Sequence, residues 1–245
     1  MWVIGADEAG RGPVIGPLVV CAFSCPAEDV ELLVEAGVKD SKLLSAKRRG
    51  EIFSWLEQTS MERGWDYHIH VSPPDEIDHA MMLGTLNEHE VNLFAHCILN
   101  LEKKDCGEIQ LDACDSNEMR FGNNVSRLIE SGIDMTNWNL ISQHGADNNY
   151  PAVAAASIIA KVSRDAAIAE LQEQMSFPIG SGYPSDSITM KAVKLMLEGD
   201  LPHFSLRWRW ETVRREWLAA GKGDVPERNV SSGTGPKPAQ RTLWG

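Results

Sequence analysis

Four acidic residues of this sequence are candidates for one shared site, although they lie far apart along the chain. They stand at the ends of apolar segments or just before a helix-like segment, and they are Asp7, Glu8, Asp112 and Asp147. Each has a simpler explanation by itself, because acidic residues also end strands, open turns and cap helices. Their chemistry becomes specific only if the fold brings them together.

Four converging carboxylates would repel one another, and some would be forced to stay protonated. Two divalent cations remove this conflict, because their charge balances that of the four acids. Ligands that are all oxygen favour Mg²⁺ or Mn²⁺ over Zn²⁺. Two such ions can activate a water molecule and stabilise the leaving oxygen in phosphodiester hydrolysis. Convergence would therefore predict a metal-dependent phosphodiesterase.

The glycines that follow the first acidic pair bear on this convergence. Neighbouring side chains of a regular strand point to opposite faces. Asp7 and Glu8 can therefore serve one site only where the strand ends or twists, and Gly10 and Gly12 favour such a change. Asp112 also ends an apolar segment, at the strand end where open α/β sheets place their sites.

The apolar patterning predicts the elements that must position these acids. Strands are expected over residues 2–8, 14–23, 66–71, 108–113 and 138–143. Helices are expected over about 28–37, 45–60, 84–101, 117–131, 151–173, 187–199 and 206–219. Three early strands followed by two strands separated by helices predict an α/β fold, with a mixed sheet flanked by helices. We expect one domain over residues 1–220 and a flexible tail, rich in Gly, Pro and Ser, over 221–245.

The composition is ordinary for a soluble globular protein. The 245 residues are 43% hydrophobic and 24% charged, and no apolar stretch is long enough to predict a membrane span. A net charge of −12 argues against nucleic-acid binding over the whole surface, but it allows a local basic groove. The five cysteines are scattered and no secretion signal is present, so we expect reduced thiols and a cytoplasmic protein.

The sequence DEAGRGP at positions 7–13 resembles the opening motif of ribonuclease HII, the type 2 ribonucleases H. The resemblance continues in family order through KDSK at 39–42, TLNE at 85–88, DA at 112–113, AASIIAKVSRD at 155–165 and GSGYPSD at 180–186. It covers about residues 1–215 and is strongest toward the compact archaeal form. It implies an RNase H-like fold, with a five-stranded mixed sheet flanked by helices and a helical C-terminal part.

The resemblance also implies an activity. Members of this family are endoribonucleases that cleave the RNA strand of RNA–DNA hybrids and nick on the 5′ side of single ribonucleotides in duplex DNA. A metal-activated water would attack in line and leave 5′-phosphate and 3′-hydroxyl ends. By matching position, the catalytic and metal-binding residues would be Asp7, Glu8, Asp112 and Asp147, with two Mg²⁺ or Mn²⁺ ions. Asp115 is a competing candidate that matches less well.

The resemblance assigns substrate contacts as well. The backbone of Gly10, Arg11 and Gly12 would approach the ribose 2′-hydroxyl, which distinguishes RNA from DNA. Tyr183 would stack on the following deoxyribose, whereas without the motif it would simply pack against a helix.

Two basic segments are candidates for phosphate contacts. Ser157, Lys161 and Arg164 are spaced to share one helix face. Lys42 belongs to a second basic cluster, with Lys39, Lys47, Arg48 and Arg49. A solvated helix face is the alternative for both segments.

The sequence departs from archaeal relatives at two places. Gly145 follows His144 where relatives often have a His-Lys pair, so one basic contact beside the site is missing. Residues 207–210 are Arg, Trp, Arg and Trp, which either pack or contact DNA.

Other functions remain open from the sequence alone. The enzyme alternative is a ribonuclease HIII-like hybrid nuclease, and the alternative of another class is a non-catalytic, clamp-associated nucleic-acid-binding module. The final residues Gln240, Leu243 and Trp244 resemble a truncated sliding-clamp interaction peptide, with an ordinary disordered end as the alternative.

Overall fold

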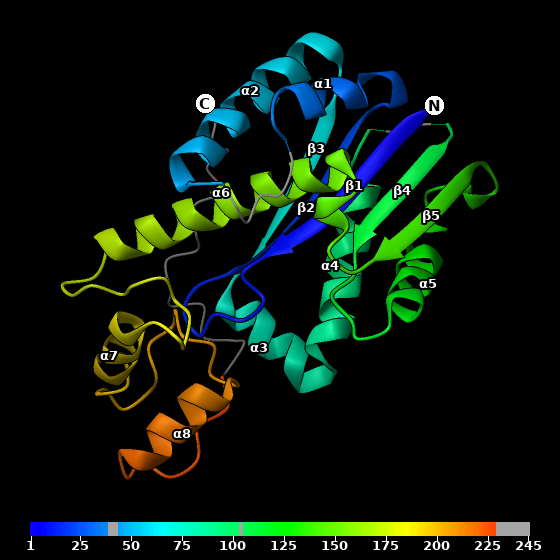
Figure 1. Ribbon diagram of the computed structural model, residues 1–245. Coiled ribbons are helices and arrows are strands. Elements are labelled where there is room, and N and C mark those ends of the chain that lie inside the picture. The colour runs from blue at the N-terminus through cyan, green and yellow to red at the C-terminus, as the bar shows by residue number, and fades with distance from the viewer. Residues whose placement is uncertain (39–43, 103–104, 229–245) are drawn as a thin grey trace.

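A five-stranded mixed sheet forms the centre of the computed structural model, which describes residues 1–38, 44–102 and 105–228 (Figure 1). The strands are β1 (Trp2–Ala9), β2 (Leu18–Pro26), β3 (Asp66–Ser72), β4 (Gly107–Asp112) and β5 (Trp138–Gln143). Their order is β3-β2-β1-β4-β5. β1 pairs antiparallel with β2 and parallel with β4, so the mixed α/β sheet predicted from the sequence is confirmed.

Helices cover both faces of the sheet (Figure 1). The face that carries Val3 and Ala9 of β1 packs on α1 (Val30–Glu35), α2 (Ala46–Arg63) and α6 (Pro151–Glu173). The face that carries Ile4 and Ala6 packs on α3 (Pro74–Leu83), α4 (Leu86–Leu99) and α5 (Glu118–Ile129). Because both faces of β1 are buried, its side chains alternate between two apolar cores.

The C-terminal part has its own small core beyond the sheet. Two helices, α7 (Ser187–Met196) and α8 (Glu211–Ala219), pack with Val14 and Ile15 from the loop after β1. Three short 3₁₀ turns complete the regular elements, at Ala27–Asp29, Met135–Asn137 and Ala146–Asn148. The helical C-terminal part predicted from the sequence is therefore present.

The predicted strand over 14–23 was wrong at its start, because β2 begins only at Leu18. Val14 donates its backbone N–H to the Gly182 carbonyl instead, and Gly16 donates to the Ser205 carbonyl. Ile15 forms an isolated antiparallel bridge with Leu206. Residues 14–16 thus form hydrogen bonds with the C-terminal part rather than with the sheet.

Two helix predictions also differ from the structure. Helix α8 begins at Glu211 and not at residue 206, because residues 205–207 pair with the segment after β1. Helix α3, over Pro74–Leu83, was not predicted from the sequence. Proline is well suited to the first turn of a helix, and Pro74 occupies that position.

The first residues of the predicted tail lie against the domain. Lys222 Nζ donates to the carbonyls of Glu198 and Gly199. The Arg228 guanidinium lies 3.1 Å from the Asp78 carboxylate and stacks over the Trp208 ring. The domain boundary at residue 220 stays a prediction, as does the character of the tail. Residue 42 and residues 229–245 lie outside the described part of the chain. No helix among the described residues is long and apolar enough to cross a membrane.

A direct backbone contact sets the position of α6 on the sheet. A Cβ atom at Gly5 of β1 would lie 2.1 Å from the Ala152 carbonyl carbon and 2.3 Å from the Val153 nitrogen. Since these are backbone atoms, they cannot rotate away. Gly5 therefore allows the first turn of α6 to lie directly on β1.

Gly5→Ala should consequently destabilise the protein, by about 1–3 kcal/mol or more, because the added methyl group overpacks a rigid contact. We expect the melting temperature to fall by about 3–10 °C, measured by calorimetry or circular dichroism. Gly50→Ala is the matched control, since nothing lies within 4 Å of its added Cβ on helix α2. That control should be neutral or slightly stabilising. Equal melting temperatures for the two variants would contradict the argument.

Candidate active site

Three carboxylates meet on the α6 side of the sheet. The parallel register of β1 and β4 pairs Ala6 with Leu111, which puts Asp7 and Asp112 at the next position along each strand. Asp147 comes from the short turn that precedes α6. One carboxylate oxygen from each of these three residues lies within 4.8 Å of the others. Asp7 and Asp147 are buried, with exposed fractions of 4% and 1%.

The turn before α6 is shaped by Gly145. This residue has a φ of 63°, in the left-handed region that favours glycine. Its backbone N–H donates to Asp112 Oδ1 at 2.8 Å, and the next N–H, from Ala146, reaches the same oxygen at 3.4 Å. The sequence departure at Gly145 thus has a backbone role, because it ties the strand-end Asp112 to the turn that carries Asp147.

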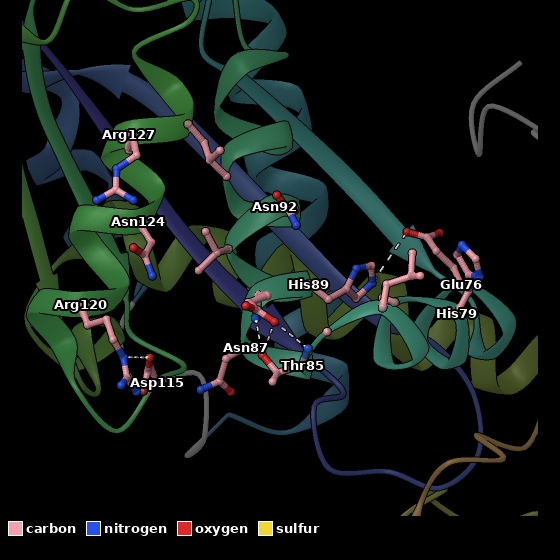
Figure 2. A pocket seen from close by; sticks show the side chains of 16 residues that line it. Glu76, His79, Thr85, Asn87, His89, Asn92, Asp115, Arg120, Asn124 and Arg127 are labelled. Atoms are coloured by element: carbon pink, nitrogen blue, oxygen red, sulfur yellow. Dashed lines mark hydrogen bonds and ion pairs between the residues drawn. The ribbon is translucent and has the colours of Figure 1, made fainter.

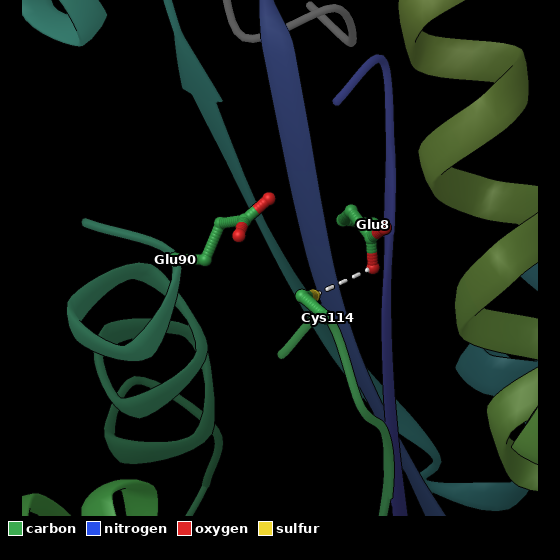
Figure 3. Close-up of side chains that lie close together, drawn as sticks. All are labelled: Glu8, Glu90 and Cys114. Carbon is green, nitrogen blue, oxygen red and sulfur yellow. Dashed lines mark hydrogen bonds between the residues drawn. The ribbon is translucent and has the colours of Figure 1, made fainter. Parts of the chain in front are cut away.

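Glu8 lies on the opposite face of β1, as strand alternation requires. Its carboxylate accepts a hydrogen bond from the Cys114 thiol at 3.1 Å, and Glu90 projects toward the pair from α4 (Figure 3). Ligand atoms of Glu8, Glu90 and Cys114 lie within 4.8 Å of one another. The Glu8 backbone N–H donates to Asp7 Oδ1 at 2.7 Å. The structure therefore gathers three of the four predicted acids in one cluster and places the fourth in an adjoining one.

Sequence reasoning missed both Glu90 and Cys114. Glu90 stands three and four residues from Leu93 and Phe94, on the buried face of α4. A charged residue at an apolar position of a helix is a detectable signal, because burying a charge without a partner is unfavourable. Cys114 stands only two residues after Asp112, but a lone cysteine carries no spacing signal.

The clustered acids perturb one another. Burial, followed by the Glu8 charge, holds the pKa of Asp7 well above its usual value. Burial and the neighbouring Asp7 and Asp147 raise the pKa of Asp112 to about 6. Burial also raises the pKa of Glu8, with Glu90 as the next cause. Carboxylates that together bind divalent cations repel one another in this way when the cations are not included.

Two residues of α6 support Asp7 from behind. Ser157 is fully buried, and its hydroxyl accepts a hydrogen bond from Lys161 Nζ at 2.6 Å. The same Ser157 side chain hydrogen-bonds Asp7, and the Lys161 charge lowers the pKa of Asp7. The sequence predicted that Ser157 and Lys161 contact phosphates. In the structure, both side chains interact with Asp7, a candidate metal ligand.

The loop of residues 10–12, called the glycine loop below, lies beside Tyr183. A Cβ atom at Gly12 would lie 3.6 Å from the Tyr183 ring. Arg164, 6% exposed, stacks its guanidinium 5.2 Å from the centre of that ring and donates to the Ser181 carbonyl. Gly10 has a φ of 88°, and a Cβ there would come within 2.6 Å of Arg164. Arg164 therefore lies behind the loop and the tyrosine, while Tyr183 is 38% exposed.

The side chain of Arg11 is held by α4. Its Nε donates to Glu90 at 2.8 Å, and its Nη2 donates to Asn87 Oδ1 at 2.6 Å. Despite this pairing, burial raises the pKa of Glu90 to about 7. The ion pair links the glycine loop to the Glu8 cluster.

Asp115, the competing candidate, has a different partner. Its carboxylate is paired with the Arg120 guanidinium, and hydrogen bonds from that side chain hold the pKa of Asp115 well below its usual range. Neither cluster of candidate ligands includes it.

A cavity of about 1020 Å³ opens between α4 and α5 (Figure 2). Asn87 and Asn92 line it from α4, and Arg120, Asn124 and Arg127 line it from α5. None of the four predicted acids contributes to its wall. Asn87, the partner of Arg11, lies in the wall of this cavity.

Comparison with known proteins decides the family. A family model described as "Ribonuclease HII" matches residues 4–213. The chain belongs to the ribonuclease HII family. The ribonuclease HII of Methanocella arvoryzae is 43% identical over 193 residues, which cover 78% of this chain and 80% of that relative. This chain is accordingly a metal-dependent type 2 ribonuclease H, an endonuclease that acts on RNA in RNA–DNA hybrids.

Solved structures of family members agree with this fold. The crystal structure of ribonuclease H2 from Pyrococcus horikoshii has a TM-score of 0.77 and 37% identity, and the match covers 91% of this chain and all of that one. The ribonuclease HII in the PCNA:RNase HII complex from Archaeoglobus fulgidus has a TM-score of 0.74 and 33% identity, with 86% and 96% coverage. The RNase H-like fold implied by the sequence motifs is therefore confirmed.

The raised pKa values of the acids predict that the ribonuclease HII site destabilises the metal-free protein. A carboxylate with a raised pKa contributes stability below its unfolded value, near 3.8 for Asp112, and this contribution is lost as the pH rises through about 6. At pH 7 without metal, Asp7→Asn should therefore raise the melting temperature, by about 2–6 °C, because it removes one buried negative charge. The same variant should lose most of the stabilisation that Mg²⁺ or Mn²⁺ gives to the unmodified chain. Both effects can be measured by thermal denaturation in EDTA and in metal.

Asp134→Asn is the matched control, because Asp134 is held by Thr136 at a surface turn away from either cluster. This variant should not gain stability in EDTA and should keep the full response to metal. A lower melting temperature for metal-free Asp7→Asn, or an undiminished metal response, would contradict the prediction.

Proposed function

We propose that Asp7, Glu8, Asp112 and Asp147 hold two divalent ions, Mg²⁺ or Mn²⁺, and that this centre hydrolyses the RNA strand of hybrids and nicks 5′ of single ribonucleotides in DNA. The observation that carries the proposal is the convergence of the Asp7, Asp112 and Asp147 oxygens within 4.8 Å. All the donors are carboxylates, which suits hard cations of this class. The raised pKa values of Asp7 and Asp112 support the same assignment.

Glu8 would join the centre across the end of β1. Its backbone N–H donates to Asp7 Oδ1 at 2.7 Å, although its thiol partner Cys114 lies on the α4 side. Burial and Glu90 are the main causes of the raised pKa of Glu8, and the charge of Asp112 contributes to it. A change of side-chain rotamer at Glu8 would exchange the Cys114 contact for a shared cation. We therefore assign Glu8 to the outer side of the centre and Asp7 to its middle.

The residues around the acids orient the reaction. Ser157 and Lys161 fix the Asp7 carboxylate from α6, and the Gly145 N–H fixes that of Asp112. Divalent ions bound between these acids supply a nucleophilic water and neutralise charge on the scissile phosphate. Water adds to phosphorus and the 3′ oxygen leaves with a proton, which gives 5′-phosphate and 3′-hydroxyl ends.

The substrate contacts that we propose lie beside this centre. Gly12 lies next to the partly exposed ring of Tyr183, so one nucleotide sugar on the backbone of Gly10, Arg11 and Gly12 would also contact that ring. This supports a role for both in selecting ribose over deoxyribose. Lys161 is the partly exposed cation nearest to Asp7 that the structure describes, and we keep it as a candidate for a phosphate contact. Ser157 and Arg164 would act by holding Asp7 and Tyr183. The role of Lys42 in phosphate binding stays a prediction.

The decisive experiment is cleavage-site mapping on a DNA duplex that contains one ribonucleotide, with Mg²⁺ and Mn²⁺ titrated separately. We expect a single nick on the 5′ side of the ribonucleotide, and none in EDTA. Asp7→Asn should lower the rate by at least about 10³-fold, since it removes the central ligand while the fold persists.

Asp134→Asn again serves as the control and should cleave at the normal rate. An all-DNA duplex should stay intact. Absence of cleavage with both metals would sink the enzymatic assignment of these residues and favour a non-catalytic binding module. Cleavage of long hybrids without cleavage at single ribonucleotides would instead support the narrower activity of a hybrid nuclease.

We also propose that the C-terminal residues Gln240, Leu243 and Trp244 bind a sliding clamp. The support is the sequence pattern together with the Archaeoglobus fulgidus relative, whose structure is a complex with PCNA. A protein truncated after residue 237 should lose affinity for the archaeal clamp in calorimetry or surface plasmon resonance. It should cleave short substrates as the full chain does, because the four acids lie far earlier in the chain. Unchanged clamp affinity after truncation would refute this role.

We also propose that the protein is located in the cytoplasm. All five cysteines are free thiols, and Cys21, Cys25 and Cys97 are buried. Free thiols of this kind are typical of a reducing compartment.

A further inference from the structure

We propose that Arg207 is a positioning residue for substrate selection, which acts by holding the glycine loop in its substrate-binding shape. The inference rests on the proposed role of that loop in ribose recognition. Arg207 belongs to the segment between α7 and α8, nearly two hundred residues after the loop. It does not contact the candidate metal ligands through any hydrogen bond or ion pair found among the described residues.

The side-chain hydrogen bonds of Arg207 all lead to the segment after β1. Nε donates to the Gly16 carbonyl at 3.0 Å, Nη1 donates to the Arg11 carbonyl at 2.9 Å, and Nη2 donates to the Gly10 carbonyl. The planar guanidinium has donors in a fixed fork, so the three carbonyl directions are set together. One side chain therefore fixes the carbonyls of Gly10 and Arg11 in the glycine loop relative to the carbonyl of Gly16.

Neighbouring residues extend this support. Trp210 stacks on the Arg207 guanidinium at 4.7 Å, and its Nε1–H donates to the Gly12 carbonyl at 3.4 Å. Carbonyls of all three loop residues are thus bonded by side chains from residues 207–210. The backbone of the same segment also pairs just beyond the loop, because the Arg207 N–H donates to the Val14 carbonyl.

Packing alone does not account for an arginine at this place. Arg207 is 0% exposed, and the described structure shows no carboxylate within ion-pair distance of it. Burial lowers its pKa to about 9, with the Arg164 charge as the next cause. An apolar side chain would avoid this desolvation, but it could not bond carbonyls that are themselves buried. In our interpretation, the loop requires an arginine at this position because the guanidinium N–H groups donate hydrogen bonds in fixed directions.

The test compares Arg207→Lys and Arg207→Met with the unmodified chain. Amide hydrogen exchange of residues 10–12, measured on the metal-free protein without substrate, should become faster in both variants, and more so in Arg207→Met. The value of kcat/KM on the single-ribonucleotide duplex should fall by about 100-fold in Arg207→Met, as expected for misplaced contacts. Arg207→Lys should recover part of this loss. The melting-temperature shift caused by Mn²⁺ should stay unchanged, because the metal ligands are untouched.

Arg209→Met is the matched control, since it removes a positive charge from the exposed residue two positions away. Its loop amides should exchange at the normal rate. Native exchange and native kcat/KM in a folded Arg207 variant would overturn the proposal, and so would an equal loss of the Mn²⁺ response. If Arg207→Met does not fold, Arg207→Lys decides the question alone, because an ammonium group cannot reproduce the three-way fork.

The exchange measurement separates this proposal from the proposed function. If the unmodified chain fails to cleave single ribonucleotides, the functional assignment fails, yet the exchange rates still show whether Arg207 holds the loop. If the unmodified chain cleaves and the variants cleave equally well, only the role of Arg207 is lost.

Discussion

Repulsion between buried carboxylates is the constraint to which the rest of this fold responds. Asp7, Asp112 and Asp147 approach within 4.8 Å, and burial makes their mutual charge more unfavourable. Rigid backbone contacts hold the three carboxylates together against this repulsion. The strand register places Asp7 and Asp112 side by side, Gly5 seats α6 on β1, and the amide of Gly145 holds Asp112. Affinity for divalent cations follows, because a cation removes the repulsion while the scaffold prevents the acids from separating.

The alternation of β1 divides the site between two faces of the sheet. Asp7 faces α6, where Ser157 and Lys161 support it, whereas Glu8 faces α4, where Cys114 and Glu90 lie. Arg11 then connects the second face to the glycine loop through its ion pair with Glu90. The candidate metal ligands Asp7 and Glu8 and the glycine loop that we propose for ribose selection therefore lie next to one another in the sequence, within the six residues that end β1 and open the loop.

Local signals in the sequence predicted the sheet and most helices, and the resemblance of its motifs implied a shared site of Asp7, Glu8, Asp112 and Asp147. The structure brings three of these acids together and places Glu8 in the adjoining cluster. The predicted features depend on strand periodicity, on motif order and on the rule that sites lie at strand ends. The sequence could not show that Ser157 and Arg164 turn inward, because a helix face has the same spacing whether it meets solvent or a strand. It also could not show the pairing of Ile15 with Leu206, which joins residues almost two hundred positions apart. Glu90 was detectable as a charge on an apolar helix face, but its partner Arg11 was not.

The attachment of Arg228 has a geometric consequence for recruitment. This residue is anchored to Asp78 and Trp208, one position from Arg207, and it ends the described part of the chain. About a dozen residues separate it from Gln240. Since a chain spans at most about 3.6 Å per residue, any partner held at the extreme C-terminus stays within about 40 Å of this anchor. If that partner is a clamp that encircles DNA, the short connection keeps the nuclease within roughly one turn of duplex from the clamp.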